Sequence, residues 1–222
     1  MNRYAVIVAG GSGSRMGSAV PKQFMLLRGK PVLWHTLNTF LSVDERLQVI
    51  LVLPEAYMEA GRVLAAGFGQ PGRIRLVAGG ETRFHSVARG LALIGEEAVI
   101  AVHDGVRCLV GVDLVRRCFE QAARLGSAIP VVASKDSVRL ITPTGSEPLD
   151  RSRVKLVQTP QTFLSDILLP AYQARYRDTF TDEATVVEAA GHTVHLIDGD
   201  AGNIKITLPG DLLLAERLLA GE

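Results

Sequence analysis

The sequence predicts an α/β protein with a Rossmann-like open sheet, mostly parallel and twisted, that carries helices on both faces. Two observations predict this fold. Continuous β-branched and apolar runs, typical of strands buried on both faces, occur at Tyr4–Val8, Gln48–Leu53, Ile74–Val77, Ala98–Val102 and Ile129–Val132. Segments with the apolar spacing of amphipathic helices separate these runs. The alternation favours right-handed crossovers and a ligand crevice at the carboxyl ends of the strands.

The helical segments and the last strands follow from the same periodicity. Apolar residues repeat at helical spacing after Pro31 (Leu33, Leu37, Phe40) and later at Val63/Leu64, Val87/Leu91 and Leu114/Phe119. Two further strands are expected at Thr193–Ile197 and Asn203–Ile206. Pro209-Gly-Asp is expected to open a final amphipathic helix that ends at Leu219.

The alternation of strand and helix breaks between Ser134 and Leu156. Turn signals at Thr142-Pro-Thr-Gly and Glu147-Pro separate short alternating pieces there. We therefore expect residues 134–156 to form a protruding β-arm on a single domain that spans residues 1–222.

Composition excludes several classes of protein. With 222 residues, 47% of them hydrophobic, the chain is not intrinsically disordered. A net charge of +1 disfavours nucleic acid recognised by bulk charge. Cys108 and Cys118 are too few for a disulfide framework or a four-cysteine zinc site, and we expect buried, reduced thiols. The first apolar run is too short for a signal peptide or membrane span, so we expect a cytoplasmic protein without a membrane partner.

A glycine-rich loop follows the first strand. It reads Ala9-Gly10-Gly11-Ser12-Gly13-Ser14-Arg15-Met16-Gly17 and is followed by Pro21-Lys22-Gln23. Glycines allow backbone N–H groups to wrap a phosphate. The loop lacks the Gly-Lys-Ser/Thr of a P-loop and the glycine spacing of a nucleophile elbow, and Met16 stands where the dinucleotide fingerprint has its third glycine.

The basic residues around this loop predict a polyanionic partner. Five basic residues precede the first acidic residue, Asp44: Arg3, Arg15, Lys22, Arg28 and Lys30. Arg15 offers a planar fork for paired phosphate oxygens, and Lys22 offers a compact charge. The alternative is an ordinary glycine turn with solvated basic residues.

Two further segments carry candidate functional residues. Asp104 follows a strand and could order a magnesium ion or accept a hydrogen bond from a substrate hydroxyl, while Arg107 could hold an anion. The alternative there is a simple Asp-Gly turn. Lys205 lies in an expected strand, where it either meets anions in the crevice or faces water.

Taken together, these motifs resemble the 2-C-methyl-D-erythritol 4-phosphate cytidylyltransferase family. The motifs, in order along nearly the whole chain, are Ala9-Gly-Gly-Ser-Gly-Ser-Arg-Met-Gly with Pro21-Lys-Gln, Val102-His-Asp-Gly-Val-Arg107, Thr159-Pro-Gln, Thr181-Asp-Glu-Ala and Asn203-Ile-Lys-Ile-Thr207. The resemblance implies an enzyme that joins CTP to a polyol phosphate, releases pyrophosphate and works as a homodimer with Mg²⁺ in the non-mevalonate isoprenoid pathway.

The resemblance also implies roles for individual residues. The triphosphate would be wrapped by Ala9, Gly10, Gly11 and Gly13, with Arg15, Lys22 and Lys205 as the catalytic cations. The cytosine and ribose would be bordered by Gly80, Glu81 and Ser86. On the polyol-phosphate side would lie Asp104, Arg107, Ser137, Arg151, Thr159 and Thr181. Of these, Ser137, Arg151 and Thr159 would reach the neighbouring subunit's substrate, because the arm matches the family's dimerisation element.

The chain departs from the family pattern after Asp104. Most members read Asp-Ala-Ala-Arg-Pro, whereas this chain has Asp104-Gly-Val-Arg-Cys108. Because proline fixes φ and restricts the residue before it, we expect a looser loop here.

The implied reaction requires no general base. A substrate phosphate oxygen, already ionised at neutral pH, would attack the α-phosphorus of CTP, and Mg²⁺ would bridge phosphate oxygens. Positioning and positive charge would then supply catalysis. Three alternatives remain: a cytidylyltransferase for ribitol 5-phosphate or another pentitol phosphate, a non-catalytic nucleotide-binding module, and a nicotinamide oxidoreductase. The last is disfavoured by the glycine spacing.

Overall fold

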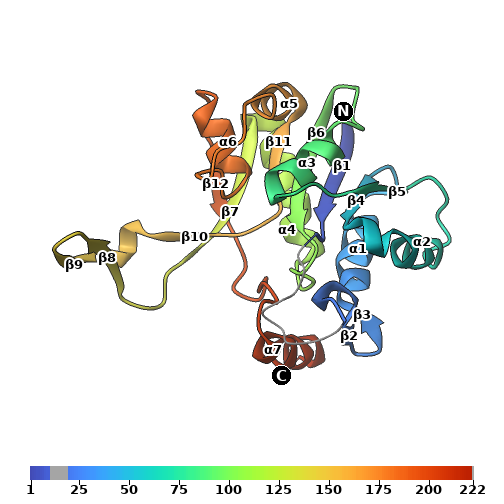
Figure 1. Ribbon diagram of the computed structural model, residues 1–222, viewed down its shortest axis with the longest axis horizontal. Helices are drawn as coiled ribbons and strands as arrows, with labels where there is room; N and C mark the ends of the chain where they lie inside the picture. The colour runs from blue at the N-terminus through green and yellow to red at the C-terminus, as the bar shows by residue number, and fades with distance from the viewer. Residues whose placement is uncertain (11–19, 222) are drawn as a thin grey trace.

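The computed structural model describes residues 1–10 and 20–221. Its main sheet has the order β10-β7-β11-β6-β1-β4-β5, with β12 paired to β7 (Figure 1). In chain order these strands are β1 (Asn2–Val8), β4 (Gln48–Leu53), β5 (Ile74–Ala78), β6 (Ala98–Asp104), β7 (Ser127–Ala133), β10 (Lys155–Val157), β11 (Gln161–Leu164) and β12 (Leu196–Asp198). The five predicted runs are therefore all strands, and the open sheet is confirmed.

Most pairs in the sheet are parallel, as the buried runs predict. β1 pairs in parallel with both β4 and β6, whereas β11 lies antiparallel between β6 and β7. The chain moves from β1 to β4 on one side and later reaches β6 on the other. This reversal of strand order is the point at which open α/β sheets form a ligand crevice.

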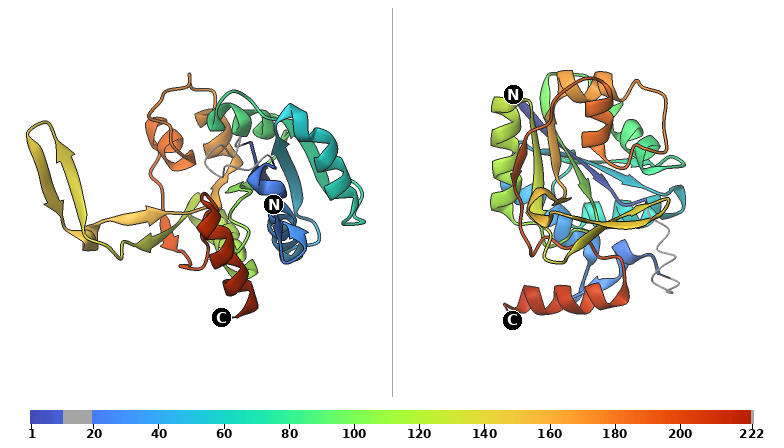
Figure 2. Two further views of the ribbon diagram at one scale, coloured as in Figure 1. Left: turned by 60° about the horizontal axis from the view of Figure 1, so that its bottom comes forward. Right: turned by 90° about the vertical axis from the view of Figure 1, so that its left-hand side faces the viewer.

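Helices cover both faces of the sheet (Figure 2). Alternate β1 side chains point to opposite faces, so Tyr4 and Val6 belong to one apolar core and Ala5 and Ile7 to the other. The first core is completed by α3 (Arg83–Leu91), α5 (Ser165–Ala171) and α6 (Glu183–Ala189). The second is completed by α1 (Val32–Val43), α2 (Met58–Ala66) and α4 (Val112–Leu125). No helix in residues 1–10 and 20–221 is long and apolar enough to cross a membrane.

A small third core holds the last helix, α7 (Pro209–Ala220), beside the short strands β2 (Leu26–Leu27) and β3 (Lys30–Pro31). The predicted final helix is confirmed. Cys108 belongs to this core and Cys118 to the second, and burial raises the pKa of each thiol to about 12. Both cysteines are buried and free, as expected.

Two strand predictions near the C-terminus need correction. The strand expected at Thr193–Ile197 begins only at Leu196. The one expected at Asn203–Ile206 does not form, and this segment is irregular. Its polar groups are used individually instead: the Asn203 amide donates to the carbonyl oxygen of Thr159 at 2.9 Å, and the Ile206 N–H donates to that of Val106 at 3.0 Å. The segment therefore joins two loops rather than a sheet.

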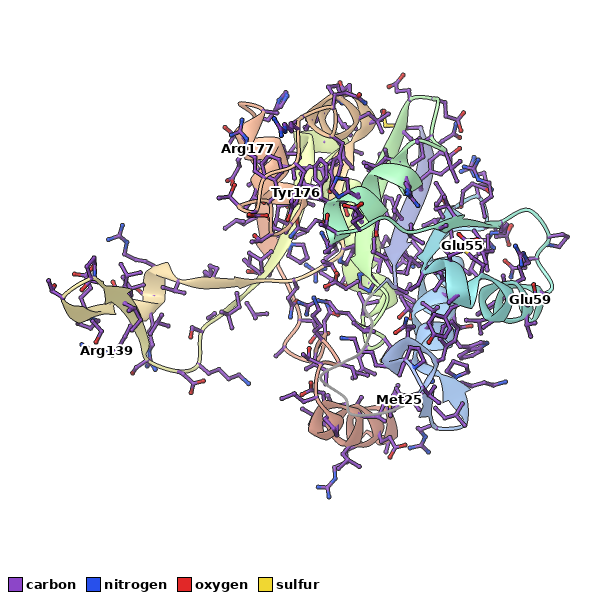
Figure 3. All side chains as sticks on the ribbon, in the orientation of Figure 1. Met25, Glu55, Glu59, Arg139, Tyr176 and Arg177 are labelled. Atoms are coloured by element: carbon purple, nitrogen blue, oxygen red, sulfur yellow. The ribbon has the colours of Figure 1, made fainter. Side chains whose placement is uncertain are left out.

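Residues 134–156 contain a hairpin of β8 (Val138–Thr142) and β9 (Gly145–Leu149), followed by the 3₁₀ turn η4 (Arg151–Arg153). The hairpin forms its own two-stranded sheet. It lies away from the main sheet in Figure 1 and in the left-hand view of Figure 2, and Arg139 is labelled on it in Figure 3. Its apolar Leu140 and Ile141 are 47% and 78% exposed.

The loop after β6, which lacks the family's proline, is held by hydrogen bonds and by packing. The N–H of Arg107 donates to the carbonyl oxygen of Asp104 at 2.9 Å, and Thr36 donates to that of Gly105 at 2.9 Å. Val106 and Cys108 are buried. A Cβ at Gly105 would lie 3.0 Å from that of Ala9, so this position favours a small residue. Packing and hydrogen bonds replace the constraint that proline would supply.

Candidate active site

A cavity of about 320 Å³ opens at the carboxyl ends of β1 and β6, where the strand order reverses. Val8 and Asp104 are paired across these two strands, so the residues that follow them share one edge of the sheet. The cavity is lined by Val8, Ala9, Gly10, Lys22, Gln23, Gly80, Glu81, Thr82, Arg83, Ser86, Asp104, Val106 and Lys205. Asp104 and seven other predicted site residues therefore line this cavity. The seven are Ala9, Gly10, Lys22, Gly80, Glu81, Ser86 and Lys205.

Ala9 and Gly10, the first two residues of the glycine-rich segment, line the cavity directly after β1. The N–H of Ala9 donates to the carbonyl oxygen of Val52 at 2.9 Å, which fixes the start of the loop against β4. The Gln23 amide donates to the carbonyl oxygen of Ala9 at 2.9 Å, joining the loop to the Pro-Lys-Gln segment. The predicted residues Gly11, Gly13 and Arg15 lie outside the described residues.

The opposite wall is a tight corner between β5 and α3. The N–H of Gly80 donates to Ser86 Oγ at 3.1 Å. A Cβ at Gly80 would lie 2.5 Å from that of His85, so glycine is required for this close approach. Thr82 caps α3 by accepting from the N–H of His85. Backbone and hydroxyl groups of this kind suit the edge of a planar base.

Three cations surround the carboxylate of Asp104. Lys205 Nζ lies 2.9 Å from Oδ2, Arg83 Nε lies 3.2 Å from Oδ1, and Arg107 Nε lies 3.6 Å from Oδ2. Burial alone would raise the pKa of Asp104, but Arg83, Lys205 and Arg107 hold that pKa far below its ordinary value. The carboxylate is therefore ionised at neutral pH.

A second carboxylate, that of Glu183, also holds Arg83. Arg83 makes a bidentate pair with Glu183, at 2.6 and 2.9 Å, and Tyr172 donates to the same carboxylate at 3.0 Å. Glu183 is fully buried. Burial would lower the pKa of Arg83, but Glu183 and Asp104 outweigh it and raise that pKa well above its ordinary value. This pair was not among the residues predicted from the sequence, although Glu183 stands in the Thr181-Asp-Glu-Ala motif.

The two lysines reach the cavity from distant segments. Lys22 lies in the 3₁₀ turn η2 (Lys22–Phe24), is 9% exposed, and donates to the carbonyl oxygen of Ile206 at 3.1 Å. The side chain of Lys205 is 43% exposed and rests on Asp104. Of the two alternatives for Lys205, the structure shows the one in which it meets an anion in the crevice.

A second cavity of about 180 Å³ adjoins the first, sharing Arg83, Asp104 and Lys205 with it. It adds Arg107, Thr159 and Thr181, with Val157, Gln158, Gln161 and Asp182. Three predicted polyol-phosphate residues thus lie together beside Asp104.

The remaining polyol-phosphate candidates lie elsewhere. Ser137 precedes β8, and Arg151, in η4, donates to the carbonyl oxygen of Lys135. Thr159, which is expected to reach a neighbouring subunit together with them, is 5% exposed and accepts a hydrogen bond from the N–H of Asp104 in its own chain.

The residues at the cavity suit a metal ion that is held mainly by substrate. Within residues 1–10 and 20–221, no group of three or more His, Cys, Asp or Glu side chains could by itself hold a metal. Asp104 nevertheless presents an ionised carboxylate between the two cavities. Mg²⁺ is commonly bound through one or two carboxylates together with substrate phosphates, and this donor set fits that pattern.

Comparisons with known proteins identify the family. The sequence profile described as 2-C-methyl-D-erythritol 4-phosphate cytidylyltransferase matches residues 4–221. This chain belongs to the 2-C-methyl-D-erythritol 4-phosphate cytidylyltransferase family. The protein of that name from Bacteroides fragilis is 48% identical over 99% of this chain and 100% of its own length, and that from Bacteroides thetaiotaomicron is 47% identical over 99% and 100%.

Solved structures agree with this membership. The crystal structure of 4-diphosphocytidyl-2C-methyl-D-erythritol synthase from Anaerococcus prevotii has a TM-score of 0.86 at 27% identity, covering 99% of this chain and 96% of that one. The cytidylyltransferase from Thermus thermophilus has a TM-score of 0.77 at 30% identity, covering 99% and 100%. The predicted family and enzyme class, a nucleotidyltransferase, are confirmed.

Proposed function

We propose that this enzyme transfers a cytidylyl group from CTP to 2-C-methyl-D-erythritol 4-phosphate, giving 4-diphosphocytidyl-2-C-methyl-D-erythritol and pyrophosphate. The proposal rests on two adjoining cavities, which share Arg83, Asp104 and Lys205, in a chain that belongs to this family. The larger cavity is lined by Ala9, Gly10, the backbone corner at Gly80 and Lys22, and the smaller by Arg107 and Thr181. Lys205 and Asp104 stand where the two meet.

Catalysis in this arrangement consists of positioning and charge neutralisation. The attacking phosphate oxygen is already ionised, so no proton has to be removed from it. His103, the histidine next to Asp104, is fully buried, and burial lowers its pKa to about 3, which leaves it neutral at pH 7. It is therefore unsuited to proton transfer in the reaction. Lys22 would face the triphosphate, and Lys205 would lie between the two phosphates that must approach each other.

Mg²⁺ is the metal that we propose for this site. The phosphate oxygens of CTP would supply most of its ligands, because both oxygens of Asp104 already face Arg83, Arg107 and Lys205. When bound, the ion would neutralise charge on the triphosphate. Arg83 and Lys205, which hold the two oxygens of Asp104, would keep that carboxylate oriented.

We further propose a homodimer in which the β8–β9 arm contacts the second subunit. The arm exposes Leu140 and Ile141, together with Leu149, instead of burying them in its own chain. Exposed apolar groups on a projecting hairpin are typical of a protein interface. Ser137 and Arg151 would then reach the polyol phosphate of the partner. A cytoplasmic location and the absence of a nucleic-acid partner belong to the same proposal.

One assay separates this function from its alternatives. Pyrophosphate release is measured with CTP and Mg²⁺ in the presence of 2-C-methyl-D-erythritol 4-phosphate or ribitol 5-phosphate. We expect release with the first and at least about 10-fold less with the second. Greater release with ribitol 5-phosphate would identify a pentitol-phosphate enzyme. CTP binding without release from either compound would identify a non-catalytic binding module.

A further inference from the structure

Lys205 lies in a segment that regular secondary structure does not hold in place. Residues 199–208, between β12 and α7, contain neither a strand nor a helix. A lysine within a strand would take its position from the hydrogen bonds of the sheet. The position of Lys205 depends instead on hydrogen bonds between individual groups of this segment and the side chains around it.

Gln158, which follows β10, supplies the first of these hydrogen bonds. It is 6% exposed. Its side-chain Nε2 donates to the carbonyl oxygen of Asp200 at 2.7 Å, and its Oε1 accepts from the N–H of the same residue at 3.1 Å. Asn203 Nδ2 also donates to this Oε1, at 3.4 Å. The amide therefore pairs with both backbone groups of Asp200, as a residue of a neighbouring strand would do in a sheet.

The turn that begins at Gly199 packs closely against this amide. A Cβ at Gly199 would lie 2.5 Å from Gln158 Oε1. The N–H of Gly199 donates to the carbonyl oxygen of Val131 on β7 at 2.9 Å, and the N–H of Asn203 closes the turn by donating to the carbonyl oxygen of Asp200 at 3.0 Å. The glutamine amide thus holds the start of a turn whose end is Asn203.

Contacts on either side of Lys205 carry this constraint to the lysine itself. Asn203 is fully buried, and its carbonyl oxygen accepts from Arg107 Nη1 at 2.8 Å. Beyond the lysine, the N–H of Ile206 donates to the carbonyl oxygen of Val106 at 3.0 Å. The backbone of Lys205 is therefore held between two fixed neighbours, and the first of them ends the turn that the glutamine amide holds.

We propose that Gln158 is a positioning residue, which acts through Lys205 by fixing the backbone of residues 200–203. This inference rests on the proposed function, in which Lys205 lies between the two phosphates that react. A cation in that role has to stand at one point relative to both phosphates. A turn released two residues before Lys205 moves the cation away from that point, so the rate of the chemical step falls.

Hydrogen exchange measured by NMR tests the contact without any assay of activity. In the wild type, the N–H of Asp200 should exchange at least about 30-fold more slowly than in an unstructured peptide, because it is bonded to a buried acceptor. Gln158→Met keeps the length of the side chain and removes the amide, and should abolish most of this protection. An unprotected Asp200 N–H in the wild type, or protection that survives Gln158→Met, would overturn the inference.

The same substitution at Gln121 is a matched control. The Gln121 amide also donates to a backbone carbonyl of the C-terminal segment, that of Leu196 at 3.3 Å, but this contact precedes the turn at residues 200–203. We expect Gln121→Met to leave the exchange of the Asp200 N–H unchanged. Equal loss of protection in both variants would show that Gln158 has no specific hold on the turn, and would contradict the inference.

Steady-state kinetics with CTP, Mg²⁺ and 2-C-methyl-D-erythritol 4-phosphate test the functional consequence. Gln158→Met should lower kcat about 10- to 100-fold, because displacing a catalytic group by about 1 Å has effects of up to that size. Gln121→Met should stay within about 3-fold of wild type. In a Lys205→Met background, Gln158→Met should lower kcat by less than about 3-fold more, since the cation that it places is already absent.

This cycle separates positioning from a general loss of stability. A substitution that only destabilises the fold would lower kcat by the same factor with and without Lys205, and that result would contradict the inference. So would a Gln158→Met enzyme with the kcat of the wild type. Thermal unfolding shows which variants fold.

Gly199→Ala reaches the same contact from the other side. Its Cβ would displace the end of a flexible side chain, Gln158 Oε1, whereas the next nearest atom, the carbonyl oxygen of Val131, is 3.1 Å away. If Gln158→Met does not fold, Gly199→Ala decides: it should release the Asp200 N–H and lower kcat, and a released N–H with an unchanged kcat would refute the inference. A wild-type enzyme that releases no pyrophosphate would refute the proposed function alone, because the exchange result does not depend on it.

Discussion

The substitution Glu183→Gln tests whether the buried carboxylate behind Arg83 holds the site together. Glu183 is fully buried and accepts three hydrogen bonds, two of them from the guanidinium. Glutamine keeps one acceptor oxygen and replaces the other with an NH₂ group that faces Arg83. The charge-assisted bond lost is worth about 1.5–3 kcal/mol, and breaking a buried pair costs about 3–5 kcal/mol.

The expected cost lies at the lower end of that range. The side chain of Arg83 is 29% exposed and keeps Asp104 as a second partner. We therefore expect Glu183→Gln to reduce the free energy of unfolding by about 3 kcal/mol at pH 7. Urea unfolding followed by far-ultraviolet circular dichroism measures this value, provided that the slope with urea is unchanged.

The same substitution at Glu59 is a matched control. Glu59 also lies 2.6 Å from an arginine, Arg62, but the two side chains are 77% and 60% exposed. Glu59 is labelled on α2 in Figure 3. Exposed pairs contribute about 0–1 kcal/mol, so Glu59→Gln should change stability by less than about 1 kcal/mol. Equal losses for both variants would refute the reasoning, because burial would then have no influence on the cost.

Three further outcomes are expected. The pKa of His103 is about 3 in the folded chain and 6.5 ordinarily, so the folded state binds fewer protons than the unfolded state between these pH values. The free energy of unfolding should therefore fall as pH drops from 6.5 towards 3, by up to about 1.4 kcal/mol per pH unit. Urea unfolding measured across this pH range should show a smaller dependence of stability on pH for His103→Gln. Lys22→Ala should cost about 3 kcal/mol of transition-state stabilisation with a smaller change in CTP binding, and steady-state kinetics showing a raised KM with unchanged kcat would contradict its role. Inactive Lys22→Ala and Arg151→Ala chains, mixed and assayed for pyrophosphate release, should recover partial activity; no recovery would argue against a site shared between subunits.

The sheet was predictable because its strands are buried on both faces. Such strands read as continuous apolar runs, and β4 has the same limits as the run that predicted it. The rule of alternating polar and apolar residues failed at Asn203–Ile206. That pattern is typical of a half-exposed strand, but Asn203 is buried and its amide donates a hydrogen bond to the carbonyl oxygen of Thr159. Periodicity does not reveal which partner a buried polar group will find.

The site residues in the loops that follow strands were predictable from the sequence. The buried pairs that support them were not. Lys22, Asp104 and Lys205 meet at the cavity because the fold brings their segments to one edge of the sheet. The ion pair of Arg83 with Glu183 joins residues 100 positions apart, so no local sequence pattern predicts it. The His103–Thr159 contact likewise depends on where β6 ends relative to β11.

The two carboxylates explain how a site for polyanions can hold its cations close together before substrate arrives. Arg83, Arg107 and Lys205 all lie within 4 Å of Asp104, and without it they would repel one another. Glu183 pairs with Arg83 from the buried side, and in the proposed function Arg83 would orient Asp104. Lys205 is the most exposed of the three and shares Asp104 with both arginines. In the proposed function, Lys205 would exchange its Asp104 contact for a phosphate oxygen while the two arginines keep the carboxylate compensated.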